Sequence, residues 1–447
     1  MNITETLIDY IENISQADFP SEIKQKVKNC FIDYLGVLIV GSYTQKDATT
    51  VYLNTTGDTG KCSVFGTGGI VTTSHLAAFL NAYNAHISEL DDGHRYGMLH
   101  LGAPIFSAVL AAVQSNVIVG WDNFYHGIIV AYETAIKLAK VIQPNHKLNG
   151  YHTTGTCGTI GAAIAIAVAG KYSRTQMLST LACAATSAAG LLELIDNTSE
   201  LKPYNVGRAS MDGLNAAMWG KIGYIPPQDS IGGKRGFLNV MANGVDKTIV
   251  FPKEPEILNI YTKPYAACRH CHSAIDAALI MRPQIADKLD QVRTIHILSY
   301  KLAMEGHIHT EVNSASSAKM SIPYSVAAAF VLGHANIDAF SSDTLKNQTI
   351  RMLINKTMVS EDASLTALCP DKRATVIVIK MADGKEITER VEYAKGEPEN
   401  AMSEDEIDDK TISLFLHARK DEQIARAIIH GIRYETLQFD DIIKLCG

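Results

Sequence analysis

The chain has 447 residues, of which 47% are apolar and 19% charged, with 32 Gly and 13 Pro. This composition excludes disordered, collagen-like and coiled-coil proteins, and the length predicts two or three domains. Lys and Arg number 40 and Asp and Glu number 47, so the net charge of -7 gives no general attraction to nucleic acid or to an anionic membrane. We therefore expect neither partner, and we expect any anion-binding site to be local.

Three features favour a cytoplasmic protein. Residues 1–15 carry acids among the apolar positions and no basic leader of the kind found in secretory signals. The longest nearly uncharged apolar run, residues 157–170, is shorter than the roughly 20 residues of a membrane-spanning helix. The eight cysteines are scattered along the chain, which favours reduced thiols over a disulfide framework.

Apolar residues recur at helical spacing through about the first 250 residues. The pattern predicts helices at 4–15, from Pro20 through Ile39, along 76–90, and at 104–114, 122–142, 156–169, 175–195 and 211–222. Several of these segments are rich in Ala, Gly, Ser and Thr. Because small side chains let helix axes approach closely, we expect these helices at the centre of a bundle.

The pattern changes near Tyr261. Residues 291–300 have strand character, and 374–381 and 386–391 flank Asp383-Gly384, a strong hairpin signal. Helices are predicted between the strands at 274–289 and 324–333, and a charged amphipathic helix from Ser403 to the end. The second part of the chain is therefore predicted to be a smaller α+β unit, with the last segment packing back on the first part.

The densest polar cluster runs from His86 to His100. Glu89 lies one helical turn after His86, and Glu89 and Asp91 stand at a helix end, where the helix dipole disfavours acids. The cluster is either a functional site or a solvated helix end with a turn at Gly93. A metal site is a further candidate, although the spacing matches no standard zinc or iron motif.

A second polar stretch, residues 150–158, precedes an Ala-rich helix. The unpaired amides of a helix N-terminus, together with nearby Thr hydroxyls, form a favourable site for a substrate carboxylate. His152 lies just outside this terminus and could transfer a proton. The alternative is a structural histidine beside a buried helix. A phosphate-binding loop, a Ser nucleophile elbow and a dinucleotide fingerprint are absent from the sequence.

Two Lys-Pro-Tyr motifs begin at Lys202 and Lys263. Proline fixes the backbone beside each lysine and so lowers the entropy that the cation loses on binding an anion; ordinary surface lysines are the alternative. Cys268 and Cys271 form a CxxC beside His272, but no second ligand pair stands at a spacing suited to zinc. Tyr324, at the start of a small-residue helix, is either a core aromatic residue or a phenol that donates a proton.

Five segments, in order along the chain, carry a resemblance to a known family. They are Asn84-Ala-His86 with Leu90-Asp91-Asp92 and His100-Leu-Gly102; Gly150-Tyr-His152-Thr-Thr-Gly155-Thr; Leu201-Lys202-Pro with Gly207-Arg-Ala209; Lys263-Pro264-Tyr265 with His272-Ser-Ala-Ile-Asp276; and Pro323-Tyr324. Together they resemble the MmgE/PrpD family, which includes 2-methylcitrate dehydratase, cis-aconitate decarboxylase and iminodisuccinate epimerase. One such segment is a weak signal, whereas five in order are a strong one.

The resemblance implies a mainly α fold, with a large all-helical domain (residues 1–260 plus 400–447) and a smaller α+β lid domain (residues 261–399). It further implies an enzyme without cofactor or metal, a homodimer, and an active site in the cleft between the domains that takes a small di- or tricarboxylic acid. The family's site residues fall on Glu89, His100, His152, Lys202, Lys263, His272 and Tyr324.

Family chemistry implies proton removal next to a carboxylate. On this basis His152 is expected to be the base and His100 or Tyr324 the acid, with Glu89 or Asp91 orienting a histidine. Lys202 and Lys263 would stabilise the extra negative charge of the intermediate, and His272 would help to bind the substrate.

Three reactions and one binding function follow from the resemblance. Dehydration of a 2-methylcitrate-like acid is preferred, and epimerisation of an iminodisuccinate-like acid is the next alternative. Decarboxylation of the cis-aconitate type follows, because Gly93 and Cys268 stand where decarboxylase-like members carry Thr and His. The fourth is a catalytically silent dimer that binds carboxylic acids.

Overall fold

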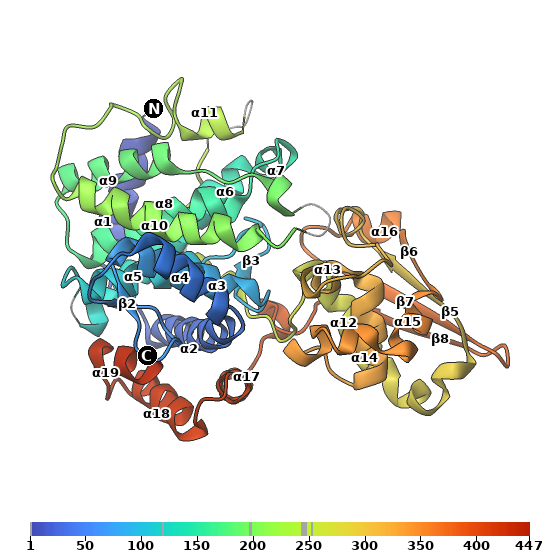
Figure 1. Cartoon of the computed structure of the whole chain (residues 1–447). Coiled ribbons are helices and arrows are strands. Elements are labelled where there is room, and N and C mark those ends of the chain that lie inside the picture. The colour runs from blue at the N-terminus through green and yellow to red at the C-terminus, as the bar shows by residue number, and fades with distance from the viewer. Residues whose placement is uncertain (1, 119, 196–198, 243–247, 252–253) are drawn as a thin grey trace.

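A computed structural model describes residues 2–118, 120–195, 199–242, 248–251 and 254–447. The chain forms a large helical part and a smaller part in which helices cover one four-stranded sheet (Figure 1). The mainly α fold class predicted from the sequence is confirmed. None of the described helices combines the length and the apolar character that crossing a membrane requires.

The helical part is built around α8 (Thr153–Ala169), in which every residue is buried. This helix packs against α6 (Trp121–Ile142) and α10 (Lys202–Gly220). The close approach depends on small residues, since a Cβ added at Gly213 in α10 would lie 2.6 Å from the Cβ of Ala162 in α8. The surrounding helices are α1 (Ile3–Ser15), α2 (Ser21–Thr44), α3 (Lys46–Thr56), α4 (Ser74–Ile87), α5 (Gly102–Gln114), α7 (Asn145–Leu148), α9 (Arg174–Ser187) and α11 (Phe237–Met241).

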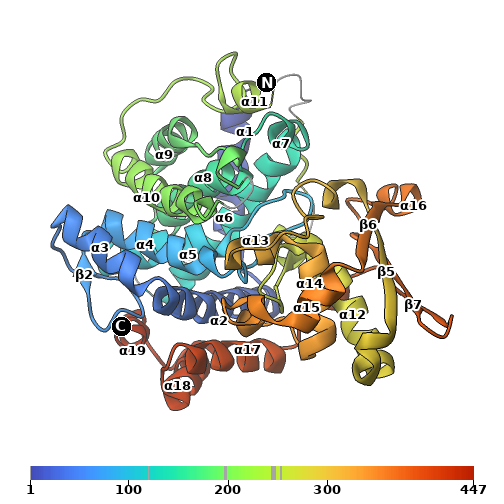
Figure 2. The ribbon, with the colours of Figure 1, turned by 45° about the vertical axis from the view of Figure 1, so that its right-hand side comes forward.

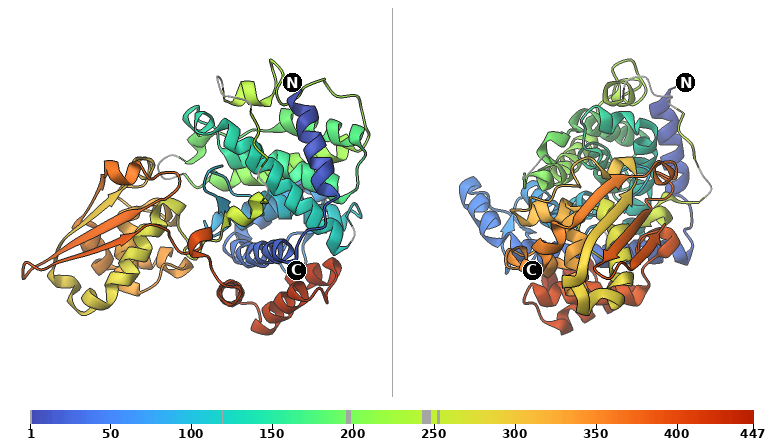
Figure 3. Two further views of the ribbon diagram at one scale, coloured as in Figure 1. Left: turned by 180° about the vertical axis from the view of Figure 1, so that it is seen from behind. Right: turned by 90° about the vertical axis from the view of Figure 1, so that its right-hand side faces the viewer.

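The smaller part contains a sheet of order β6-β5-β7-β8. Its strands are β5 (Val292–Ser299), β6 (Thr357–Glu361), β7 (Thr375–Met381) and β8 (Glu386–Val391). β6 runs parallel to β5, and the other neighbours are antiparallel. Helices α12 (His272–Ile285) and α14 (Ile322–Leu332) pack on the sheet and on each other. The view from behind shows the sheet at the end of the molecule away from the helical part (Figure 3, left). The remaining helices here are α13 (Ala315–Met320), α15 (Gln348–Ile354) and α16 (Ala363–Thr366).

The two parts are joined by a pair of short strands and by ion pairs. Gly93 and His94 (β3) pair with Ile260 and Tyr261 (β4) just before the chain enters the smaller part, and a second short pair, β1 (Cys62–Ser63) with β2 (Val71–Thr72), lies elsewhere in the helical part. Arg95 contacts Glu397 and Glu399, where the chain leaves the smaller part. The last helices, α17 (Glu404–His417), α18 (Glu422–Arg433) and α19 (Phe439–Cys446), return to the helical part (Figure 2). There α17 packs on α2, and Lys410 forms an ion pair with Asp33.

Several predicted helix boundaries were wrong. The helix predicted at 175–195 ends at Ser187, because Gly190 adopts a φ of 147°, a conformation that favours glycine. The helix predicted at 211–222 begins earlier, at Lys202, with Pro203 in its first turn, a position that proline favours. The segment after Ser403 forms three helices, because Arg419 and Glu435 adopt left-handed conformations between them.

The helix predicted at 274–289 is also shorter than expected. It ends as an α-helix at Ile285 and continues as a 3-10 turn over Ala286–Gln291.

Candidate active site

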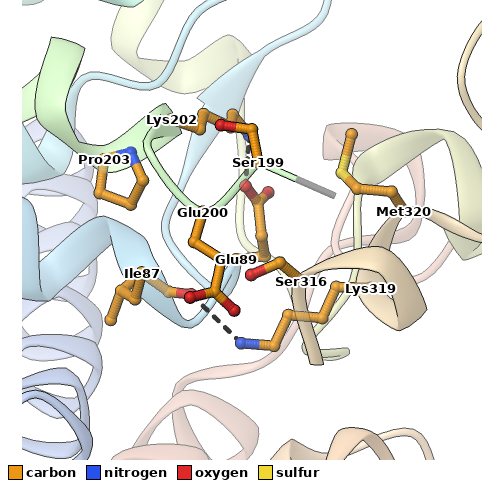
Figure 4. Close-up of a pocket in the computed structure, with 9 residues that line it drawn as sticks. All are labelled: Ile87, Glu89, Ser199, Glu200, Lys202, Pro203, Ser316, Lys319 and Met320. Atoms are coloured by element: carbon orange, nitrogen blue, oxygen red, sulfur yellow. Dashed lines mark hydrogen bonds and ion pairs between the residues drawn. The ribbon is translucent and has the colours of Figure 1, made fainter. Parts of the chain in front are cut away.

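Glu89 is the centre of the polar cluster after α4. It follows the helix with a φ of 55°, a left-handed conformation that costs a non-glycine residue roughly 1–2 kcal/mol. Strain of this kind persists where surrounding contacts fix the residue, and it is concentrated at functional sites. The Glu89 carboxylate contacts the ammonium groups of both Lys202 and Lys263 (Figure 4 shows the contact with Lys202).

The two lysines reach Glu89 from different elements. Lys202 is the first residue of α10, and Lys263 follows β4 at the entrance to the smaller part. The Lys263 side chain is fully buried, and its Nζ lies 3.1 Å from Glu89 Oε2, 3.1 Å from the Glu89 carbonyl oxygen and 3.9 Å from Asp91 Oδ1. Burial raises the pKa of Glu89, but Lys202 and Lys263 outweigh burial and hold that pKa well below its ordinary value.

A third lysine, Lys319, lies beside this pair. It belongs to α13 in the smaller part, and its Nζ donates to the carbonyl of Ile87 at 3.2 Å (Figure 4). Burial lowers the pKa of Lys319 to about 8. Sequence analysis did not identify this residue, because a lysine in a short Ser- and Ala-rich helix shows no sign of the pocket that it lines.

His86 is paired with Asp91. Its Nδ1 lies 2.7 Å from Asp91 Oδ2 and donates to that carboxylate, while its Nε2 lies 3.8 Å from Glu89 Oε1. Asp91 is therefore placed to fix the tautomer of His86, with the lone pair on Nε2. Glu89, in contrast, is occupied by the two lysines.

His100 is held by the neighbouring acid, Asp92. The Asp92 carboxylate accepts hydrogen bonds from the backbone of Leu101 and Gly102 and from the hydroxyl of Tyr132, which fixes the start of α5. His100 Nδ1 then donates to the Asp92 carbonyl at 2.6 Å. Neutral His100 consequently carries its lone pair on Nε2. Its ring centre lies 5.0 Å from that of His86.

His152 is the N-cap residue of α8, and its side chain makes no capping hydrogen bond. Its backbone N–H donates to the Gly190 carbonyl at 3.0 Å, so that the loop after α9 holds it in place. The ring is buried, and its Nδ1 has no hydrogen-bond partner among the described residues. An unpaired buried polar atom costs about 1–3 kcal/mol of folding stability. The Nδ1 atom of His152 is therefore available to hydrogen-bond a ligand.

The three histidines share one electrostatic environment. Burial lowers the pKa of His86, His100 and His152 well below the ordinary value. Lys202 lowers all three further. All three rings are therefore neutral near pH 7 and can accept a proton.

Two of the predicted site residues lie outside this cluster of contacts. The Tyr324 hydroxyl donates to the Ala339 carbonyl at 2.8 Å, and its ring lines a separate pocket with Arg351. His272 uses both ring nitrogens within the smaller part, since Nδ1 accepts from Arg269 at 2.9 Å and Nε2 donates to the Ala267 carbonyl at 3.0 Å. His272 is fully buried and can act on the site only through its neighbours.

His86, Asp91 and His100 present side-chain atoms within 4.8 Å of one another, a set that could hold a metal ion. Binding through Nδ1 of either histidine would displace its present hydrogen bond to Asp91 or to the Asp92 carbonyl. The expectation of a metal-free site therefore stays a prediction.

Two adjoining hollows lead to the cluster. The pocket beside Glu89, Lys202 and Lys319 encloses about 30 Å³, which is enough for only one or two waters. A cleft of about 870 Å³ between the two parts is lined by Lys147, Gly150 and Leu192 on one side and by His307, His309 and Met320 on the other. Met320, the last residue of α13, lines both hollows, so they meet at the end of this helix.

The packing of Tyr261 explains why position 93 is a glycine. A Cβ at this position would lie 2.3 Å from the hydroxyl oxygen of Tyr261, its partner in the β3–β4 pair. The Tyr261 side chain therefore takes the space that a larger residue at position 93 would need.

The whole chain is similar to known proteins. The MmgE/PrpD N-terminal domain matches residues 5–249, and the MmgE/PrpD C-terminal domain matches residues 265–432. The cis-aconitate decarboxylase-like protein oryM of Aspergillus oryzae is 25% identical over 97% of this chain and 95% of its own length. The cis-aconitate decarboxylase of Aspergillus terreus is 24% identical over 90% of this chain and 87% of its own, and that of Homo sapiens 21% over 92% and 87%.

The two family domains cover most of the chain and follow each other in the order that the five sequence segments predicted. The resemblance is confirmed: this chain belongs to the MmgE/PrpD family.

Proposed function

We propose that the chain is a cofactor-independent lyase that removes a proton next to a carboxylate of a small hydroxy di- or tricarboxylic acid and eliminates water. The observation that carries the proposal is the meeting of Lys202 and Lys263 on one buried carboxylate beside three neutral histidines. Family membership supports an enzyme.

The charges suit a carbanion next to a carboxylate. Ionising a carbon beside a carboxylate creates a second negative charge, which water-poor surroundings tolerate only next to fixed cations. Three lysines lie beside the carboxylates of Glu89 and Asp91. The Glu200 carboxylate lines the same pocket and adds a further negative charge near Lys319. A substrate carboxylate would join Glu89 on these lysines.

The proton transfers are assigned to two histidines. His152 acts as the base, because its ring is neutral and its buried Nδ1 lacks a described partner. His100 acts as the acid in preference to Tyr324, whose hydroxyl is already bonded to Ala339. Substrate carboxylates add negative charge, which favours the imidazolium form of His100 that a leaving hydroxyl requires.

Decarboxylation is the second candidate, because the names of the Aspergillus and human relatives refer to cis-aconitate decarboxylase. It uses the same cations, with carbon dioxide leaving in place of water. Decarboxylation ranks second because Gly93 and Cys268 stand where decarboxylase-like members carry Thr and His. A larger residue at position 93 would clash with the Tyr261 side chain.

Proton NMR of citrate-like and hydroxy-dicarboxylic acids in deuterated buffer tests the proposal. We expect exchange of the hydrogen next to a carboxylate and the appearance of an olefinic signal, unchanged by EDTA. Carbon dioxide release would instead favour decarboxylation, and exchange with inversion alone would favour epimerisation. Stabilisation by ligand without any exchange would support the carboxylic-acid-binding dimer and contradict a lyase.

The pH profile of kcat/KM should fall as the pH rises above about 6.5 and fall more steeply above pH 8. Burial lowers the pKa of His152, which keeps its lone pair through this range; the pKa of His100 is lowered as well, so the imidazolium form that the leaving hydroxyl requires becomes scarcer as the pH rises. Above pH 8 Lys319, whose pKa is about 8, also loses its charge and binds a polyanion less well. In Lys319→Arg the steeper fall above pH 8 should disappear, and its persistence would assign it to another group.

We also propose that the protein is a homodimer that takes no nucleic acid or membrane as a partner. Trp219, near the end of α10, and Ile222 and Tyr224, just after this helix, are each more than half exposed, at 52%, 57% and 64%. Light scattering coupled to size exclusion should give twice the chain mass of 48.6 kDa, and a monomer at micromolar concentration would contradict this expectation.

A further inference from the structure

Cys268 and His307 face each other outside the lysine pocket. The sulfur of Cys268 lies 3.8 Å from His307 Nε2, and His307 lines the cleft of about 870 Å³. Cys268 itself is 9% exposed. None of the steps proposed above uses either residue.

The backbone of α13 fixes both partners. His307 Nδ1 donates to the Met320 carbonyl at 2.9 Å, and the backbone N–H of Cys268 donates to the Lys319 carbonyl at 2.8 Å. With its proton on Nδ1, neutral His307 presents the lone pair of Nε2 to the sulfur. A thiol, a base and a group that orients the base form the arrangement of an activated nucleophile.

Charges around the pair support the same conclusion. Burial raises the pKa of Cys268, but His307 outweighs burial and lowers it; burial lowers the pKa of His307, but Cys268 outweighs burial and raises it. Lys147 and Lys202 add positive charge near the sulfur, and Glu89 adds negative charge. The other seven cysteines behave in the opposite way, because burial raises the pKa of each of them: Cys30, Cys62, Cys157, Cys183, Cys271, Cys369 and Cys446.

We propose that Cys268 and His307 form a nucleophilic pair that adds to unsaturated di- or tricarboxylates, the class of product that elimination or decarboxylation would yield in the neighbouring site. The choice of electrophile rests on the proposed function. His307 lines the same cleft as Met320, which also lines the lysine pocket, so an acid in this cleft lies beside His307, whose Nε2 is 3.8 Å from the sulfur. Alkylation there would narrow the cleft and block the enzyme.

The addition balances without an oxidant or a leaving group. The Cys268 thiolate attacks the β-carbon of the C=C–carboxylate unit and forms a C–S bond, while the π electrons move to the α-carbon. The imidazolium of His307 then protonates the α-carbon and becomes neutral. Overall, the sulfur and the thiol proton are added across the double bond, and the product is a thioether.

Alkylation of the full chain, mapped by mass spectrometry of its peptides, tests the pair. Maleate serves as a dianionic unsaturated probe and iodoacetamide as a neutral one. Cys183 and Cys369 are internal controls, because both are more exposed than Cys268. We expect both reagents to label Cys268 at least tenfold faster than either control, and maleate to be slowed at least fivefold by citrate. His307→Gln should lower the rate at Cys268 at least tenfold, and Cys268→Ser should protect activity from maleate.

Labelling in order of exposure, with Cys183 and Cys369 first, would overturn the pair without affecting the proposed lyase. Fast labelling by iodoacetamide but none by maleate would overturn the choice of electrophile. Because the exchange assay reports the lyase separately, a failure of the pair and a failure of the proposed function are distinguishable.

Discussion

Replacing His152 with asparagine should lower kcat by about 10²- to 10⁴-fold, the range for loss of a positioned base, and leave the protein at least as stable as wild type. His152 occupies the N-cap of α8 with φ -91° and ψ 106°, yet its side chain caps nothing. Asparagine is among the best N-cap residues and gains about 0.5–2 kcal/mol over a residue that makes no cap. Initial rates and thermal unfolding of the variant measure both effects.

The effects on kcat and on stability together distinguish a catalytic role of His152 from a structural one. A structural histidine would lose stability and activity together when replaced, whereas a base that occupies a capping position loses activity alone. His309→Asn is the matched control, because His309 lines the cleft and its ring hydrogen-bonds, among the described residues, to Ser317 within the smaller part. Its turnover should stay within about threefold of wild type. A wild-type rate in His152→Asn would refute the assignment of the base.

Periodicity identified the helices that bury a continuous face but not where they end. The segment 104–114 matched α5 closely, because its apolar residues are buried all round. The start of α10 was missed because Lys202-Pro203 was interpreted as an anion-binding motif, although proline in a first turn is equally a start signal. The strand β6 was missed because its residues Thr357–Glu361 are only half buried and pair at one edge of the sheet.

The candidate site was predictable where residue type and position along the chain carried the information. Lys202 and Lys263 were singled out from their motifs, and the fold brings both to Glu89. The role of Glu89 as their shared partner was not foreseen, since spacing placed it beside His86. Lys319 and the pair of Cys268 with His307 depend on packing between elements distant in sequence, and no local pattern reports such packing.

Replacing Lys263 with methionine should lower kcat/KM at least 100-fold and also destabilise the protein by about 3–5 kcal/mol, the usual cost of removing one partner of a buried ion pair. The Lys263 side chain is fully buried between Glu89 and Asp91. Without it Glu89 loses one of the two cations that hold its pKa down. The stability deficit should narrow as the pH falls, because protonation of Glu89 removes the uncompensated charge. Urea unfolding at several pH values measures this trend.

A second substitution distinguishes the structural from the catalytic effect of the lysine. In Lys263→Met combined with Glu89→Gln, the uncompensated charge is absent, so most of the lost stability should return while kcat/KM stays low. Lys202→Met provides the comparison. The Lys202 side chain is 14% exposed, so its loss should lower kcat/KM by a similar factor at a smaller cost in stability. Recovery of activity in the double variant would mean that Lys263 serves only to neutralise Glu89, and the stabilisation of a carbanion would then have to come from Lys202 and Lys319.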